Sequence, residues 1–188
     1  MNSYPKNFRI DNQGFIENIK KVQSPNFDNR PDNTKIDLLV IHNISLPPNQ
    51  FGGHYVEDFF QNKLDLKKHS YFETIKDLKV SSHFLINRSG EITQFVSCDK
   101  RAWHAGESSW KKIKNCNDYS IGIELEGNDL EPFEDNQYMK LINLIKCLSN
   151  DYPISDIVGH NQIAPQRKTD PGPFFNWDLI NLEKIHEK

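Results

Sequence analysis

Two histidines and an aspartate stand at positions in this sequence that suit metal chemistry. His42 lies near the end of the apolar run 36–44 (IDLLVIHNI), and His160 ends a shorter run at 154–160. Asp170 follows ten residues after His160. Two histidines and one carboxylate form a catalytic zinc set that leaves a fourth position for water. The residue types therefore suggest a zinc site at His42, His160 and Asp170.

The segment 159–173 (GHNQIAPQRKTDPGP) carries two of these three residues. Its three prolines lack a backbone donor and fix their own φ angles, and each pushes the preceding residue towards extended geometry. We therefore expect a stiff loop, neither helix nor strand, that returns Asp170 to the neighbourhood of His160. A tetrahedral metal site tolerates little movement of its ligands, which gives this stiffness a physical reason.

Residue types and spacing alone leave the zinc hypothesis open. The chain has 7 histidines, and a single histidine at a strand end is more often a structural side chain than a ligand. The more specific HExxH motif is absent from the sequence. His83 and His104, in particular, are expected to be structural.

The hydrophobic pattern predicts the elements that must position these residues. Strands interleaved with helices favour one α/β or α+β domain with a central sheet, over the whole chain of 188 residues. Residues 1–35 are expected to form an irregular arm packed on this domain, with a short helix around 15–22. The expected strands are 36–44, 80–86, 92–96, 120–127 and 154–160, and the expected helices are 55–63, 134–150 and 176–188.

Composition and charge exclude several classes of protein. Lys and Arg total 23 against 26 for Asp and Glu, and this net charge of −3 argues against a nucleic-acid partner. No run of about 18 apolar residues predicts a membrane helix. No secretory signal is visible, so we expect a cytoplasmic protein. The three cysteines are expected to be free thiols in a reducing compartment, with a disulfide or a thiolate zinc site as the alternative.

The expected strand 120–127 (SIGIELEG) carries two candidates for proton transfer. Side chains alternate across a strand, so the apolar residues at 121, 123 and 125 face one way. Glu124 and Glu126 both face the other way, and periodicity cannot separate them.

Four stretches occur together in one order: VIHNISLPPNQFGG (40–53), DKRAWHAG (99–106), NDYSIGIELEG (117–127) and the segment 159–173. They closely resemble motifs of the zinc-dependent N-acetylmuramoyl-L-alanine amidases. Within that family they resemble the cytoplasmic branch that recycles anhydro-muropeptides. The resemblance covers roughly residues 15–180. It implies a mixed β-sheet flanked by helices, the fold of zinc amidases and peptidoglycan-recognition proteins.

The resemblance also implies a chemistry. It makes His42, His160 and Asp170 the ligands of Zn²⁺, and it makes Glu124 and Lys168 the catalytic pair. The expected reaction cleaves the amide between the lactyl group of anhydro-N-acetylmuramic acid and L-alanine in a muropeptide substrate. Glu124 would carry a proton from water to the leaving amine, and Lys168 would stabilise the oxyanion. The alternatives are a lytic amidase acting on polymeric peptidoglycan and a non-catalytic peptidoglycan-binding module.

Four further residues are candidate substrate contacts. Asn43 follows the first ligand and could hydrogen-bond the stem peptide. Trp103 offers a flat apolar face to a sugar or peptide, and the alternative is that it is a core aromatic residue. Similar amidases that cut diaminopimelate-containing muropeptides carry arginine where Lys79 and Asn115 stand here. Arginine holds a carboxylate with two parallel hydrogen bonds, which lysine cannot do. The stem-peptide preference is therefore left open.

Overall fold

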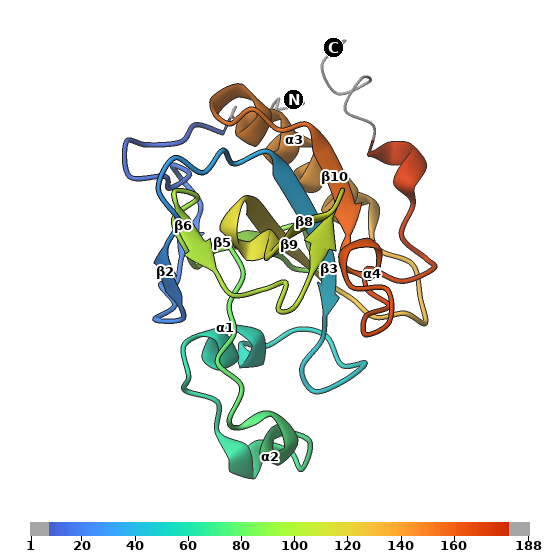
Figure 1. The fold of residues 1–188 in the computed structure, drawn as a ribbon. Helices are drawn as coiled ribbons and strands as arrows, with labels where there is room; N and C mark the ends of the chain where they lie inside the picture. The colour runs from blue at the N-terminus through green and yellow to red at the C-terminus, as the bar shows by residue number, and fades with distance from the viewer. Residues whose placement is uncertain (1–7, 181–188) are drawn as a thin grey trace.

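A six-stranded mixed sheet forms the centre of the molecule (Figure 1). The computed structural model describes residues 8–180. The strand order is β1-β5-β4-β9-β3-β10, where β4 and β5 pair antiparallel and all other neighbours pair parallel. The mixed sheet expected from the sequence is therefore confirmed. Its strands are β1 (Lys20–Lys21), β3 (Leu38–Ile44), β4 (Phe84–Ile86), β5 (Ile92–Gln94), β9 (Ser120–Glu126) and β10 (Asp156–Gly159).

Smaller elements surround this sheet. Two short ribbons pair β2 (Phe27–Asn29) with β6 (Lys100–Ala102) and β7 (Ser109–Trp110) with β8 (Ile113–Lys114). The α-helices are α1 (Tyr55–Phe60), α2 (Phe72–Ile75), α3 (Asp135–Asp151) and α4 (His160–Ile163), and 3₁₀ turns cover Leu66–Lys68, Cys116–Asp118 and Trp177–Leu179. Helices α1 and α2 form a lobe beyond one end of the sheet (Figure 1). Within residues 8–180, every helix is too short or too polar to cross a membrane.

The two faces of the sheet serve different purposes. Helix α3 covers one face, where its apolar stripe packs on alternate residues of the central strands. On β9 these are Ile121, Ile123 and Leu125, as the sequence predicted. His42 and Glu124 belong to the other set of alternate positions, and they are register partners on the neighbouring parallel strands β3 and β9. The fold therefore places both side chains next to each other on the face opposite α3.

One buried glutamine ties α3 to the sheet. Gln137 Nε2 donates to the carbonyls of Ile86 and Glu126, at 3.1 and 3.0 Å, so it bridges the ends of β4 and β9. Its Oε1 accepts from the backbone N–H of Glu134, at 3.0 Å, just before the helix begins. A single side chain thus satisfies backbone groups of three elements.

The expected helix around 15–22 is wrong. The carboxylate of Asp11 accepts hydrogen bonds from the backbone N–H groups of Gln13 and Phe15, which closes a turn there. Ile16 then forms an isolated bridge with Ile10, and the chain continues into β1. Asn18 has a φ of 59°, in the left-handed region that interrupts a right-handed helix. Local side-chain hydrogen bonds therefore outweigh the weak helical pattern.

Two expectations near the C-terminus also need correction. Residues 160–163 form the short helix α4, because the first proline of the segment comes only at position 165. The rest of the segment up to residue 173 is irregular, as expected. In place of a terminal helix over 176–188, the structure has the 3₁₀ turn Trp177–Leu179, and residues 181–188 lie outside the described part of the chain.

We expect Gln137→Ala to lower the free energy of unfolding by about 2–4 kcal/mol. The substitution leaves buried backbone groups without partners, each at a cost of about 1–3 kcal/mol. Urea denaturation followed by circular dichroism measures this change. Asn136→Ala, at an exposed position on the same helix, is the control and should stay within about 0.5 kcal/mol of the parent protein. Equal effects of the two substitutions would contradict the bridging role.

Candidate active site

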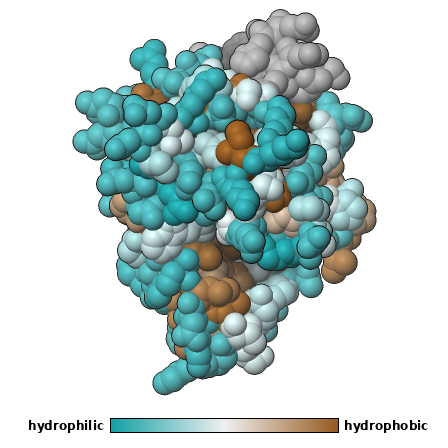
Figure 2. Space-filling model, viewed as in Figure 1, coloured by the Kyte–Doolittle hydropathy of each residue, from teal (hydrophilic) through white to brown (hydrophobic). Residues whose placement is uncertain are grey.

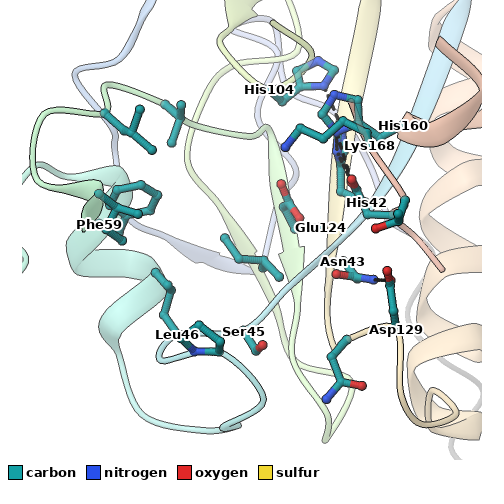
Figure 3. A pocket seen from close by; sticks show the side chains of 18 of the residues that line it. His42, Asn43, Ser45, Leu46, Phe59, His104, Glu124, Asp129, His160 and Lys168 are labelled. Carbon is teal, nitrogen blue, oxygen red and sulfur yellow. Dashed lines mark hydrogen bonds and ion pairs between the residues drawn. The ribbon is translucent and has the colours of Figure 1, made fainter. Parts of the chain in front are cut away.

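A cleft of about 700 Å³ contains the residues that the sequence singled out for metal chemistry. At one end, His42 and His160 lie beside Glu124 (Figure 3). Asp170 lies together with these two histidines. The opposite end is apolar and is built largely by the α1–α2 lobe. Hydrophobic surface gathers around a hollow over this lobe (Figure 2). The apolar wall consists of Leu46, Phe59, Tyr71, Ile75 and Leu78.

The three expected ligands converge on one point. His42 Nδ1 lies 2.9 Å from His160 Nδ1, and Asp170 Oδ2 lies 3.0 Å from each of these nitrogens. His42 comes from β3 and His160 begins α4, directly after the neighbouring strand β10. The two histidine side chains are 2% and 3% exposed, and that of Asp170 is 14% exposed. Strand β3, helix α4 and the irregular segment after it thus bring three potential ligand atoms together at the floor of the cleft.

The chemistry of these atoms fits a divalent transition metal. His160 Nε2 lies 3.1 Å from the carbonyl oxygen of Ala105. A carbonyl only accepts, so His160 carries its proton on Nε2 and presents a lone pair at Nδ1. Burial lowers the pKa of His42 to about 4, so that ring is neutral at pH 7. Neutral imidazole and carboxylate are preferred ligands of such metals, and tetrahedral zinc spaces its ligand atoms about 3.3 Å apart.

Asn43 holds the loop that carries Asp170. Its Nδ2 donates to Asp129 Oδ1 at 2.7 Å and to the carbonyl of Pro171 at 3.0 Å. The backbone of Asn161 also donates to the carbonyl of Asp170, at 2.9 Å. Asn43 lines the cleft, as expected, but its amide hydrogens are used within the protein.

Glu124 lies on the cleft floor with a carboxyl oxygen free for chemistry. Its Oε2 is buried and has no hydrogen-bond partner among the described residues. Burial, and then the negative charge of Asp170, raise the pKa of Glu124 well above its usual value, while Lys168 acts in the opposite direction. A carboxyl group with a raised pKa suits proton transfer near neutral pH.

Glu126 is buried on the same side of β9 but has a different environment. Its two oxygens accept hydrogen bonds from the backbone N–H groups of Gly52 and Arg88. These contacts fix the loop after β3 and the turn after β4. The structure therefore distinguishes two glutamates that strand periodicity could not separate.

The remaining candidates differ in their position relative to the cleft. Lys168 points into it from the rim, towards the space above Glu124 (Figure 3). Trp103 lines it and is half-buried, with a buried indole nitrogen that lacks a partner among the described residues. Lys79 is exposed and lines an adjoining groove beside α2. Asn115 is exposed in the turn before the 3₁₀ helix Cys116–Asp118.

Several cleft residues could not be identified as such from the sequence. Asp129 and Arg167 have no signal of their own, because polar residues in loops are usually solvated. His104 was expected to be structural, yet its Nδ1 lies 2.9 Å from His42 Nε2. Cys98, Cys116 and Cys147 are buried free thiols.

Comparison with known proteins agrees with this geometry. The sequence profile of the N-acetylmuramoyl-L-alanine amidase family matches residues 32–173, which include all three converging ligands. This chain belongs to that family.

Individual amidases show how far the similarity extends. The 1,6-anhydro-N-acetylmuramyl-L-alanine amidase AmpD of Haemophilus influenzae is 52% identical over 169 residues, covering 88% of this chain and 92% of that protein. A crystal structure of a selenomethionine derivative of AmpD has a TM-score of 0.89 at 47% identity, covering 94% of this chain and 98% of the other. Escherichia coli AmiD, in complex with anhydro-N-acetylmuramic acid-L-Ala-D-γ-Glu-L-Lys, gives a TM-score of 0.57 at 29% identity, covering 96% and 65%. The amidase fold with a central mixed sheet is thus shared.

Substitution of a converging ligand tests the metal site directly. We expect about one metal ion per chain in the parent protein and most of it lost in His160→Ala, because a tetrahedral site loses one of three protein ligands. Inductively coupled plasma mass spectrometry of the purified proteins measures the content. Cys116→Ser is the control and should keep its metal. Full metal content in His160→Ala would contradict the assignment.

Proposed function

We propose that this chain is a zinc amidase that hydrolyses the bond between the lactyl group of 1,6-anhydro-N-acetylmuramic acid and L-alanine, in peptidoglycan recycling. The observation that carries the proposal is the convergence of His42, His160 and Asp170 beside Glu124 in one cleft of an amidase-family chain. The name of the AmpD relative and the muropeptide bound to AmiD support this choice of substrate.

His42, His160 and Asp170 would hold the zinc ion through Nδ1, Nδ1 and Oδ2, the atoms that lie 2.9–3.0 Å from one another. Bound zinc supplies a Lewis acid that lowers the pKa of water to about 7 and polarises a carbonyl. The protein keeps these three atoms buried and close together, which limits their movement. The open side of the triad faces the cleft, where a scissile amide can enter.

Glu124 moves the proton in this proposal. Its carboxyl lies next to His42 across the parallel register of β3 and β9, and its Oε2 has no hydrogen-bond partner within residues 8–180. As the carboxylate it takes a proton from the attacking water. As the carboxylic acid it gives that proton to the nitrogen of L-alanine while the carbon–nitrogen bond breaks. A raised pKa favours the second transfer, because the protonated form is then accessible near neutral pH.

Lys168 places a positive charge where negative charge develops. It projects from the segment that carries both His160 and Asp170, so the metal ligands and this charge are held by one piece of chain. A fixed cation close to a developing oxyanion stabilises the transition state more than the ground state.

The rest of the cleft would hold the muropeptide. Trp103 offers an aromatic face to the sugar or the first peptide unit. Asn43 keeps its side-chain oxygen for a peptide N–H, since its amide hydrogens are used elsewhere. Lys79 and Asn115 lie outside the main cleft and would contact only a stem peptide that extends beyond it.

We also propose a cytoplasmic location for this amidase. The three buried free thiols support it, because disulfides persist mainly in oxidising compartments such as the periplasm. In that location the enzyme would meet released anhydro-muropeptides rather than the intact wall.

Loss of the proton carrier should separate chemistry from metal binding. We expect Glu124→Gln to lower kcat by about 10² or more, because the amide keeps the shape of the carboxylate but cannot take up a proton. Metal content and KM should change little. Steady-state kinetics on anhydro-muramyl tripeptide and metal analysis measure these quantities. Lys168→Met should also lower kcat while keeping most of the side-chain volume.

Glu126→Gln is the matched control for this experiment. It removes one of two acceptors for backbone N–H groups, so we expect reduced stability with kcat within a few-fold of the parent value. An inactive Glu126→Gln beside an active Glu124→Gln would show that Glu126, and not Glu124, carries the proton. Loss of metal in Glu124→Gln would instead make that residue a ligand or a support of one.

The choice of substrate can be measured with two substrates of different size. We expect faster turnover of anhydro-muramyl tripeptide than of intact sacculi, with release of the free tripeptide seen by mass spectrometry. Both substrates present the same scissile bond, so the comparison reports access and recognition rather than chemistry. Faster turnover of sacculi would favour a lytic amidase.

A further inference from the structure

The ring of His104 lies directly behind the metal triad, between His42 and the backbone of β9. Its Nδ1 is 2.9 Å from His42 Nε2, and its Nε2 is 3.2 Å from Ser120 Oγ. Ser120 Oγ in turn lies 2.6 Å from the carbonyl oxygen of Cys116. A continuous chain of hydrogen bonds therefore leads from a backbone carbonyl to Nε2 of His42, the ring nitrogen that points away from the triad.

The direction of every hydrogen bond in this chain follows from its outer end. The carbonyl of Cys116 can only accept, so the hydroxyl of Ser120 donates to it at 2.6 Å. The serine oxygen is then left to accept a proton from His104 Nε2. A neutral imidazole has one donor and one acceptor nitrogen, so His104 Nδ1 must accept from His42 Nε2. His42 is thereby left with a lone pair on Nδ1, the atom that faces His160 and Asp170.

The same short loop also orients the second histidine. The carbonyl of Ala105, the residue after His104, accepts from His160 Nε2 at 3.1 Å and from Arg167 Nη2 at 2.8 Å. Asn117 Oδ1 fixes this loop, because it accepts from the backbone N–H groups of both His104 and Ala105, at 3.1 and 2.8 Å. Two neighbouring residues thus turn both imidazole lone pairs towards one point.

Strand β9 has a glycine, Gly122, at the position where the ring of His104 packs against it. A Cβ atom at Gly122 would lie 2.5 Å from Cγ of His104, closer than real Cβ atoms approach other heavy atoms. Gly122 lies between Ser120 and Glu124 on the same face of β9. A side chain at this position would push the imidazole away from both Ser120 and His42.

We propose that Cys116 C=O, Ser120 and His104 form a relay that fixes the tautomer of His42, with His104 and Ser120 acting as positioning residues for zinc. The inference rests on the metal site of the proposed function. Metal ligation requires the Nδ1 lone pair of His42, and the opposite tautomer would place a proton there instead. Groups that orient a ligating histidine in this way typically contribute about 10- to 100-fold in metal affinity.

Zinc affinity, measured by competition with a chromophoric chelator, tests the relay. Two pairs of variants are compared, one at His104 and one at buried serines. His104→Leu removes the acceptor and should weaken zinc binding by about 10- to 100-fold. His104→Asn keeps an oxygen on Cγ near the position of Nδ1, and should stay within a few-fold of the parent protein. Ser120→Ala should weaken binding several-fold. Ser82→Ala should not, although Ser82 is also a buried serine that donates to a backbone carbonyl of β9.

A second readout does not depend on metal. In the metal-free protein, ¹⁵N-detected histidine NMR should show His42 protonated at Nε2, and Ser120→Ala should shift His42 towards the other tautomer. A Nδ1–H form of His42 in the parent protein would overturn the proposal. Equal zinc affinities of His104→Leu and the parent would do the same, and so would equal losses in His104→Leu and His104→Asn.

These measurements distinguish a failure of the relay from a failure of the amidase proposal. If the parent protein binds zinc and cleaves muropeptide while the relay variants bind equally well, the relay fails and the amidase stands. If the parent protein does neither, the amidase proposal fails, and the tautomer measurement still decides the relay. Near-UV circular dichroism checks the fold of each variant. If His104→Leu is unfolded, the comparison of Ser120→Ala with Ser82→Ala and the NMR spectra give the answer.

Discussion

The parallel register between β3 and β9 is the constraint on which the rest of the site depends. It sets His42 opposite Glu124, and it sets the positions of Ser120 and Gly122 on the same face. A shift of one residue would turn the polar side chains of one strand into the α3 core and its apolar side chains into the cleft. The packing of α3 on the other face therefore secures the position of the site as well as the stability of the sheet.

In the described part of the chain, most polar groups buried on the site face are paired, and one of the exceptions is informative. Glu126 satisfies two backbone N–H groups, and Asn43 ties Asp129 and Pro171 together. Glu124 Oε2 is buried without such a partner. Burying an unpaired carboxyl costs free energy, so a fold tolerates it chiefly where another group, such as a substrate or water, completes the site. This contrast supports the role of Glu124 more directly than its position in a motif.

The site is assembled from segments far apart in the chain. Strand β10 and the segment after it deliver His160 and Asp170 to His42, more than a hundred residues away in sequence. The loop at His104 and Ala105 approaches from another direction, and Asn117 holds it there. Each contact is short range in space and long range in sequence, so the geometry of the cleft exists only when the whole domain has folded.

Local sequence patterns determined much of this protein. The run 36–44 predicted the central strand, the alternation over 120–127 predicted which residues face α3, and the spacing over 134–150 predicted the long helix. The four motifs, through their resemblance to zinc amidases, pointed to the three residues that converge. These predictions succeed because hydrophobic periodicity and residue type act within a few turns or a single strand.

Tertiary structure alone decided the rest. The turn at 11–15 depends on the carboxylate of Asp11, a single side-chain contact that a periodic pattern does not register. Strand periodicity gave Glu124 and Glu126 the same face, and only the backbone N–H groups brought to Glu126 by two distant loops distinguish them. His104 looked structural because its two partners, His42 and Ser120, come from separate strands. Which buried polar group is satisfied, and by what, is a property of packing between segments, and no local pattern encodes it.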